Sequence, residues 1–257
     1  MKTASSTRET FSINGIEMYC ETHGEGEPLV LLHGGGGVGA NWGLIFKQVP
    51  DRYKLIVPDL RGHGGSTNPS GEFTFRQLAR DVFALLDHLG VERFQAVGMS
   101  MGAKILLHMA TGQPARVEAM VLVSAAPYFP EQARAIMRQV STADHTEAEW
   151  RQMREWHKHG DEQIMALWRL ADAFKDSYTD MNFTPPYLST IMARTLIVHG
   201  DRDPLYPVHL ATEMYATIPR SYLWVVPNGG HGPIFGEMAA QFAETSLAFL
   251  HGEWSRE

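Results

Sequence analysis

Residues 94–109, Phe-Gln-Ala-Val-Gly-Met-Ser-Met-Gly-Ala-Lys-Ile-Leu-Leu-His-Met, decide the fold. The apolar run that opens this stretch is typical of a buried strand, and its second half is typical of a helix. Between them, residues 98–102 match Gly-x-Ser-x-Gly, which in this context predicts a nucleophile elbow. On so tight a turn the backbone of Ser100 is strained and its hydroxyl is exposed, while the flanking glycines relieve crowding against neighbouring backbone.

With 257 residues the chain can bury a large core; its length allows one or two domains, although α/β proteins of this size are often a single unit. The chain has 22 Lys and Arg against 29 Asp and Glu, a formal net charge of −7, and no long basic run. This balance argues against nucleic acid or an anionic membrane as the main partner. Residues 1–9 lack the apolar core of a signal peptide, and no apolar run reaches the ~20 residues of a membrane helix. We therefore expect a cytoplasmic protein, with no intrachain disulfide because Cys20 is the only cysteine.

Strand and helix patterns alternate along most of the chain. A hairpin is predicted between residues 11–13 and 16–22, around the turn dipeptide Asn14-Gly15. Six apolar runs of strand length follow, at residues 28–32, 53–57, 94–97, 119–123, 195–198 and 222–226. Segments of helical period lie at residues 75–89, 208–218 and 238–250. These patterns predict an α/β fold with a mostly parallel, doubly wound, eight-stranded sheet and an antiparallel N-terminal edge.

Residues 128–187 break this alternation. They contain no strand candidate and are rich in Trp, Met, His and charged residues with helical spacing. We expect a helical cap, or lid, inserted over the carboxyl ends of the strands, with residues 1–127 and 188–257 forming the core domain. The alternative is a set of packing helices with no substrate role.

Two loops near the end of the chain carry the partners that a reactive serine needs. Residues 199–204 read His-Gly-Asp-Arg-Asp-Pro, and residues 227–233 read Pro-Asn-Gly-Gly-His-Gly-Pro. Each loop follows a predicted strand, and the order Ser…Asp…His is the one expected on this topology. With His33-Gly34-Gly35 and residues 59–64, Asp-Leu-Arg-Gly-His-Gly, these motifs give the chain from about Gly24 onward its resemblance to the α/β-hydrolase fold superfamily, specifically to small lidded esterase-like members.

The resemblance implies that Ser100 is the nucleophile and His231 the general base. For the acid, the family pattern Gly-x-x-Asp counted from Gly200 ends at Asp203, with Asp201 left as a loop-bracing alternative. Family members that place the acid earlier do so at a position that here reads Ser-Ala-Ala, residues 124–126, without a carboxylate.

An acyl-transfer reaction needs two fixed donors for its oxyanion. The backbone N–H groups of Gly35 and Met101 are the candidates, one from the loop after residues 28–32 and one from the start of the helix. The same glycine run also matches Gly-x-Gly-x-x-Gly at residues 34–39, with Asp59 placed like a ribose-binding acid, which keeps a dinucleotide-binding alternative open. Against it, no clear helix starts on the glycines.

Several histidines other than His231 also require a role. His33 and His63 lie inside motifs in which the family uses them to brace loops. His157 and His159 are two residues apart on a predicted helix, so they face different sides and do not form a metal-binding pair.

The expected function is a cofactor-free serine hydrolase that cleaves small carboxylic esters or lactones, with no metal. Haloperoxidases (perhydrolases) share the triad, and carbon–carbon hydrolases share the glycine-rich loop, although these usually have Trp after the catalytic histidine where Gly232 stands here. A ligand-binding receptor of the same fold is the non-enzymatic alternative. Haloalkane dehalogenases and epoxide hydrolases differ because they use an aspartate where this chain has Ser100. No motif specifies the substrate's acyl group or an oligomeric state.

Overall fold

The computed structural model describes residues 6–48, 50–139 and 145–254, with the side chains of residues 171 and 172 also left undescribed. The chain opens with an antiparallel hairpin of β1 (Ser6–Ile13) and β2 (Ile16–His23). Asn14 and Gly15 form its turn with positive φ angles of 47° and 77°, as a two-residue hairpin turn requires. The predicted hairpin is therefore confirmed.

The sheet has eight strands in the order β1-β2-β4-β3-β5-β6-β7-β8. The remaining strands are β3 (Glu27–Leu32), β4 (Tyr53–Pro58), β5 (Phe94–Met99), β6 (Val117–Val123), β7 (Arg194–Gly200) and β8 (Ser221–Val226). β2 pairs with β4 antiparallel, and every pairing from β4 to β8 is parallel. All six predicted apolar runs lie within these strands, and the mostly parallel eight-stranded sheet is confirmed.

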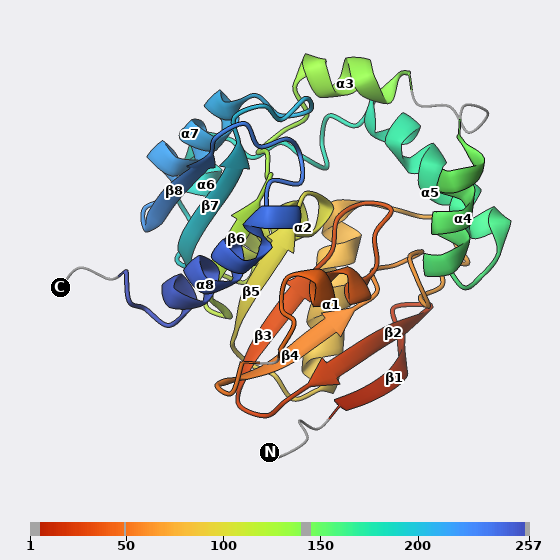
Figure 1. The fold of residues 1–257 in the computed structure, drawn as a ribbon, viewed down its shortest axis with the longest axis horizontal. Coiled ribbons are helices and arrows are strands. Elements are labelled where there is room, and N and C mark those ends of the chain that lie inside the picture. The colour runs from red at the N-terminus through yellow and green to blue at the C-terminus, as the bar shows by residue number, and fades with distance from the viewer. Residues whose placement is uncertain (1–5, 49, 140–144, 255–257) are drawn as a thin grey trace.

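Helices cover both faces of the sheet (Figure 1). They are α1 (Phe75–His88), α2 (Met101–Gly112), α7 (Val208–Thr217) and α8 (Ala239–Leu250), with short 3₁₀ helices η1 (Gly39–Leu44) and η3 (Gly236–Met238). Alternate strand residues point to opposite faces. In β3, Val30 packs in the cluster that contains α1, α2 and α7, whereas Leu31 packs with Trp42 of η1 and Phe242 of α8. This double burial explains why the central strands read as continuous apolar runs.

The stretch between β6 and β7, residues 124–193, is called the β6–β7 segment below, and its described part contains four helices. Its helices are α3 (Glu131–Met137), α4 (Glu147–Trp156), α5 (Asp161–Phe174) and α6 (Pro185–Leu188). In its described part the only β pairing is an isolated bridge between Tyr128 and Asn182. Figure 1 shows α3, α4 and α5 at the end of the sheet toward which the arrows of β5 and β6 point. This end is where the loops carrying the sequence motifs lie.

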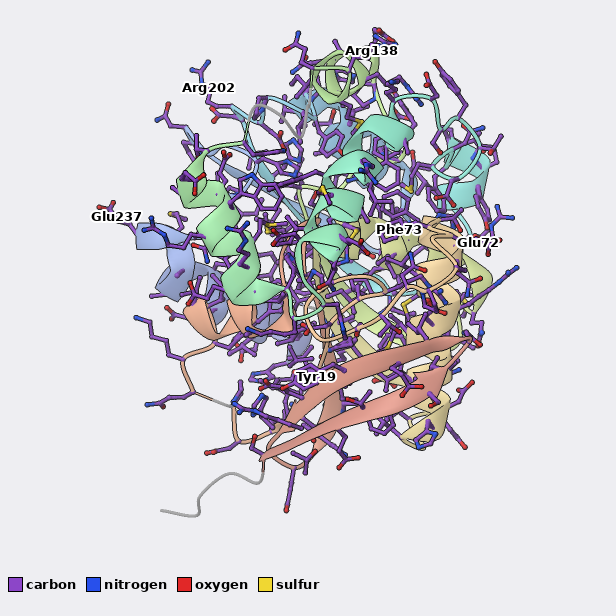
Figure 2. All side chains as sticks on the ribbon, turned by 90° about the vertical axis from the view of Figure 1, so that its right-hand side faces the viewer. Tyr19, Glu72, Phe73, Arg138, Arg202 and Glu237 are labelled. Atoms are coloured by element: carbon purple, nitrogen blue, oxygen red, sulfur yellow. The ribbon has the colours of Figure 1, made fainter. Side chains whose placement is uncertain are left out.

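The outer surface carries charged side chains together with exposed large apolar ones such as Leu44 and Met192. Figure 2 shows Arg138, Arg202 and Glu237 pointing away from the body of the molecule, with the β1–β2 hairpin at its outer edge. Within the described ranges, no helix is both long enough and apolar enough to cross a membrane.

Candidate active site

Ser100 occupies a strained turn between β5 and α2. Its φ of 48° and ψ of −103° lie in a region that residues other than glycine rarely adopt. The neighbouring glycines are required by close backbone approaches. A Cβ on Gly98 would lie 2.6 Å from the carbonyl carbon of Gly102, and one on Gly102 would lie 2.2 Å from the carbonyl oxygen of Leu32. The turn therefore has the geometry that the Gly-x-Ser-x-Gly pattern predicts.

The structure brings Ser100, His231 and Asp203 into one hydrogen-bonded chain. Ser100 Oγ lies 2.8 Å from His231 Nε2, and His231 Nδ1 lies 2.8 Å from Asp203 Oδ2. The three residues come from the loops after β5, β8 and β7, which end at the same edge of the sheet. Asp201, the alternative acid, is exposed and its carboxylate lies 3.9 Å from Arg202. Of the two aspartates, Asp203 is the one that contacts His231.

The surroundings of Asp203 keep its carboxyl ionised. Burial raises the pKa of Asp203, but the hydrogen bond from His231 lowers it, as do the backbone N–H groups of Leu205 and Tyr206. The lowering effects prevail, so the pKa lies below its ordinary value. An ionised Asp203 accepts the proton on His231 Nδ1. His231 Nε2 is then free to accept the proton of the Ser100 hydroxyl.

The two residues expected to supply oxyanion donors, Gly35 and Met101, line the same cavity as Ser100. Met101 is the first residue of α2, so its N–H has no acceptor within the helix and lies at the positive end of the helix dipole. Gly35 lies in the loop after β3, and both residues line the cavity wall. A Cβ on Gly35 would meet no atom within 4 Å, so this position is open toward the cavity.

Three buried histidines hold the loops around the glycine run. The Nε2 atoms of His33 and His63 accept the backbone N–H groups of Leu60 and Gly36, at 3.0 and 3.2 Å. Burial lowers the pKa of His33 to about 4 and that of His63 well below its ordinary value, which keeps both rings neutral acceptors. The predicted bracing role of His33 and His63 is borne out by these contacts.

The hydrogen bonds of His157 were not predicted from the sequence. α4 ends at Trp156, so the expectation that His157 and His159 lie on a helix is wrong: the capping box at Thr146 starts the helix, which then ends ten residues later. His157 Nδ1 accepts the N–H of Gly64 at 2.8 Å, and its Nε2–H donates to the carbonyl oxygen of Gly36 at 3.1 Å. Its burial lowers its pKa to about 4. His157 thus ties the β6–β7 segment to two glycine-containing loops of the sheet domain.

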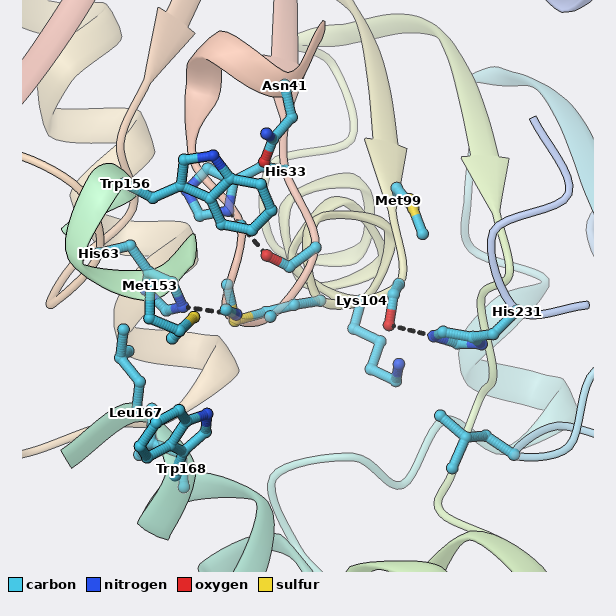
Figure 3. A pocket seen from close by; sticks show the side chains of 18 of the residues that line it. His33, Asn41, His63, Met99, Lys104, Met153, Trp156, Leu167, Trp168 and His231 are labelled. Carbon is cyan, nitrogen blue, oxygen red and sulfur yellow. Dashed lines mark hydrogen bonds between the residues drawn. The ribbon is translucent and has the colours of Figure 1, made fainter. Parts of the chain in front are cut away.

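The hydrogen-bonded chain opens into a cavity of about 760 Å³ (Figure 3). One side, called the sheet wall, includes Gly35, Ser100, Lys104 and His231. The opposite side, called the helical wall, includes Met153, Trp156, Leu167 and Trp168 from α4 and α5. Figure 3 shows Lys104 and His231 on one side of the open space and the four side chains of the helical wall on the other. The reactive polar groups thus lie on the sheet wall, and the four named residues of the helical wall are apolar, although Glu149 and Gln152 of α4 also line the cavity.

Two alternative kinds of site, a metal centre and a dinucleotide-binding loop, can be compared with the structure. No group of three or more His, Cys, Asp or Glu side chains among them has the arrangement of a metal site. The glycine run leads into the short 3₁₀ helix η1 and not into an α-helix. The dinucleotide-binding alternative needs a helix N-terminus at that place, so the geometry does not favour it.

A family model described as the alpha/beta hydrolase fold matches residues 27–181, more than half of the chain. The chain belongs to the alpha/beta hydrolase fold family. A solved alpha/beta hydrolase-like structure, a serine hydrolase involved in carbazole degradation, aligns with a TM-score of 0.79 and 22% identity. The alignment covers 96% of this chain and 99% of that one. This likeness concerns the fold, and with the family match it confirms the predicted superfamily.

Curated relatives of this alpha/beta hydrolase include hydrolases with different substrates and a putative non-heme chloroperoxidase from Synechocystis sp. (strain ATCC 27184 / PCC 6803 / Kazusa). A 2-hydroxy-6-oxo-6-(2'-aminophenyl)hexa-2,4-dienoic acid hydrolase from Metapseudomonas resinovorans is 25% identical over 97% of this chain and 93% of its own length. A soluble epoxide hydrolase from Corynebacterium sp. (strain C12) is 33% identical, but that match spans only 47% of this chain and 42% of the relative. The chain is therefore a member of a family of hydrolase enzymes.

Proposed function

We propose that this protein is a cofactor-free serine hydrolase that cleaves small carboxylic esters or lactones. Ser100 is the nucleophile, His231 the general base and Asp203 the residue that orients His231. The observation that carries the proposal is the chain of two 2.8 Å hydrogen bonds from Ser100 through His231 to Asp203, at the wall of an open cavity. Nucleophile, base and orienting acid in this arrangement are what acyl transfer requires.

In the proposed reaction, Ser100 Oγ attacks the carbonyl carbon of the substrate while its proton passes to His231 Nε2. The backbone N–H groups of Gly35 and Met101 donate to the resulting oxyanion. The tetrahedral intermediate collapses, the bond to the alcohol oxygen breaks, and His231 gives its proton to that oxygen. Water then attacks the acyl-enzyme, His231 takes the water's proton, and Ser100 recovers it as the carboxylic acid leaves.

We also propose that residues 128–187 form a cap over a core of residues 1–127 and 188–257. Support comes from the helical wall, which brings apolar side chains of α4 and α5 to the cavity that contains Ser100. Further support comes from His157, which attaches this part of the chain to the loops of the sheet domain. In this arrangement the cap determines which acyl groups reach the serine.

A fluorophosphonate probe tests the nucleophile directly, because it forms a covalent bond with an activated serine. We expect labelling of the parent protein and no labelling of Ser100→Ala. Ser189→Ala is the matched control, since Ser189 is exposed and bonds only a nearby backbone carbonyl. The proposal fails if Ser100→Ala is labelled, or if it keeps full activity on p-nitrophenyl esters.

Carbon–carbon bond hydrolysis is the second candidate. It is favoured by the near full-length match to the dienoic acid hydrolase. Against it, the residue after His231 is Gly232, where similar carbon–carbon hydrolases usually have Trp. Kinetics with that relative's named substrate and with a methyl ester separate the two: a kcat/KM at least tenfold higher for the dienoic acid would make carbon–carbon hydrolysis the main activity.

A further inference from the structure

Lys104 is a buried lysine whose side chain faces the cavity. It lies one helical turn after Ser100, and its backbone N–H donates to the carbonyl oxygen of Ser100 at 3.0 Å. The residue is only 1% exposed, yet it lines the cavity. Figure 3 shows its amino group pointing into the open space on the same side as His231. A lysine in this place is within the reach of a molecule bound at Ser100.

The amino group of Lys104 has aromatic neighbours but no anionic partner. It lies 4.3 Å from the ring centre of Tyr206 and 5.7 Å from that of Phe129. Among the described residues no hydrogen bond or ion pair is formed by Nζ. Asp203 is near enough to raise the pKa of Lys104, but its two oxygens are already engaged by His231, Leu205 and Tyr206. Among the described residues that line the cavity, the carboxylate is that of Glu149, whose side chain is 55% exposed and lies on α4.

The two ring faces compensate only part of the cost of burying an ammonium group. Removing a cation from water costs more free energy than cation–π contacts return. This imbalance lowers the pKa of Lys104 to about 7, even though Asp203 pulls it upward. Among the described residues of the cavity wall, Lys104 is the only lysine or arginine. His33 and His63 on that wall are held neutral by burial. The cavity wall thus carries one lysine amino group, charged below pH 7, whose Nζ has no ion-pair partner among the described residues.

We propose that Lys104 binds a carboxylate group of the substrate, so that the enzyme prefers esters or lactones that carry a second, free carboxylate. A single ammonium without a neighbouring arginine suits a group of charge −1 better than a phosphate dianion, which needs several donors. The apolar helical wall contacts the rest of the molecule. This inference rests on the proposed function for the identity of the reacting bond, but the binding of the carboxylate does not depend on it.

The test compares monomethyl glutarate with methyl pentanoate, two methyl esters with acyl chains of the same length that differ in the free carboxylate. Methanol release gives kcat/KM for each. The parent protein is expected to prefer monomethyl glutarate, and Lys104→Met is expected to lower the ratio of the two kcat/KM values at least tenfold. Lys47→Met makes the same chemical change at an exposed residue outside the cavity and is expected to keep the ratio. An unchanged ratio in Lys104→Met overturns the proposal.

A pH profile of the parent protein tests the same idea without a variant, which matters if Lys104→Met folds poorly. Lys104 loses its charge as the pH rises through about 7. The KM for monomethyl glutarate is therefore expected to rise several-fold between pH 6 and 8 relative to the KM for methyl pentanoate. A purely structural lysine would not separate the two substrates, so parallel KM profiles contradict the proposal.

Calorimetry separates a failure of this proposal from a failure of the proposed function. Glutarate is titrated into Ser100→Ala and into the double variant that adds Lys104→Met, neither of which needs to turn over an ester. Binding at least tenfold weaker in the double variant supports the carboxylate site even if no ester is cleaved by the parent. Equal affinity in the two variants overturns it even if ester hydrolysis is observed.

Discussion

The two walls of the cavity are held in place by different kinds of interaction. On the sheet wall, Ser100 and His231 are fixed by strained backbone and by short hydrogen bonds, and Asp203 holds His231 from behind. On the helical wall the contacts are those of packed side chains. For example, the rings of Trp150 and Trp168 form an edge-to-face pair with their centres 4.5 Å apart. Hydrogen-bonded geometry tolerates little displacement, whereas an apolar surface tolerates changes of shape. We therefore expect changes on the sheet wall to alter the reaction and changes on the helical wall to alter the choice of substrate.

The largest effect is expected for His231→Gln. It removes the base from Ser100 and leaves the backbone donors in place, so kcat for ester hydrolysis should fall roughly 10⁴- to 10⁶-fold. Steady-state kinetics on a p-nitrophenyl ester measure it. A loss smaller than tenfold would contradict the role given to the sheet wall.

The next largest effect is expected for Asp203→Asn, which also tests whether Asp203 or Asp201 orients His231. Asp203→Asn should lower kcat about 10⁴-fold, because an amide stabilises the wrong tautomer of His231. Asp201→Asn is the matched control and should remain within about twofold, since Asp201 is exposed. The reverse outcome, with Asp201→Asn inactive and Asp203→Asn active, would assign the acid to Asp201.

Acid should loosen the junction between the two walls. His157 has its ordinary pKa near 6.5 when unfolded and about 4 when folded, so the unfolded chain binds the extra proton between these values. The contribution of His157 to the free energy of unfolding should thus be at its full value above pH 6.5 and should fall as the pH drops toward 4. The fall is about 1.4 kcal/mol per pH unit for each buried histidine whose pKa is lowered in this way.

Urea unfolding at several pH values tests this dependence. In His157→Gln the free energy of unfolding should fall less steeply with decreasing pH, by the contribution of one histidine, about 1.4 kcal/mol per pH unit. His209→Gln, a change at an exposed histidine, should keep the parent slope. Identical pH dependences in the parent and His157→Gln would contradict the proposal that protonation of His157 loosens the contact between the β6–β7 segment and the sheet domain.

The smallest effect is expected on the helical wall. Trp168→Ala enlarges the cavity, so the preference should shift toward longer acyl chains, by several-fold in the ratio of kcat/KM for octanoate and butanoate esters. Trp254→Ala, a tryptophan that packs on α8 away from the cavity, should leave that ratio unchanged. A Trp168→Ala variant that lost activity equally on every ester would show that the helical wall also supports the reaction step.

The two walls also differ in how far the sequence predicts them. The strands, the hairpin at Asn14-Gly15 and the loops that carry Ser100, Asp203 and His231 were predictable because each is a local pattern. The rule that parallel strands end at one edge of the sheet then brings the loops together. On the helical wall, helical spacing predicts helices but not which of their faces turns toward Ser100, because that depends on packing between segments distant in the chain.

Lys104 and His157 show why individual residues escape such reasoning. Lys104 carried one usable signal, a lone charge in a helix whose neighbours are otherwise apolar, but its cavity-facing direction depends on Phe129 and Tyr206 from other elements. His157 lies just beyond the end of α4, and its partners Gly36 and Gly64 are about a hundred residues away in sequence. Neither the aromatic contacts of Lys104 nor the hydrogen bonds of His157 can be predicted from a local sequence pattern.

The contacts of Gly36 have a consequence for engineering. This residue has a positive φ of 71°, donates to His63, accepts from His157 and directly follows Gly35. A cap exchanged from a relative would replace His157 and change the support of the peptide next to the proposed oxyanion donor. We expect chimeric proteins with exchanged caps to lose rate as well as change substrate, unless a histidine is retained at this junction. We therefore expect that the proposed cap cannot be exchanged independently of the sheet domain.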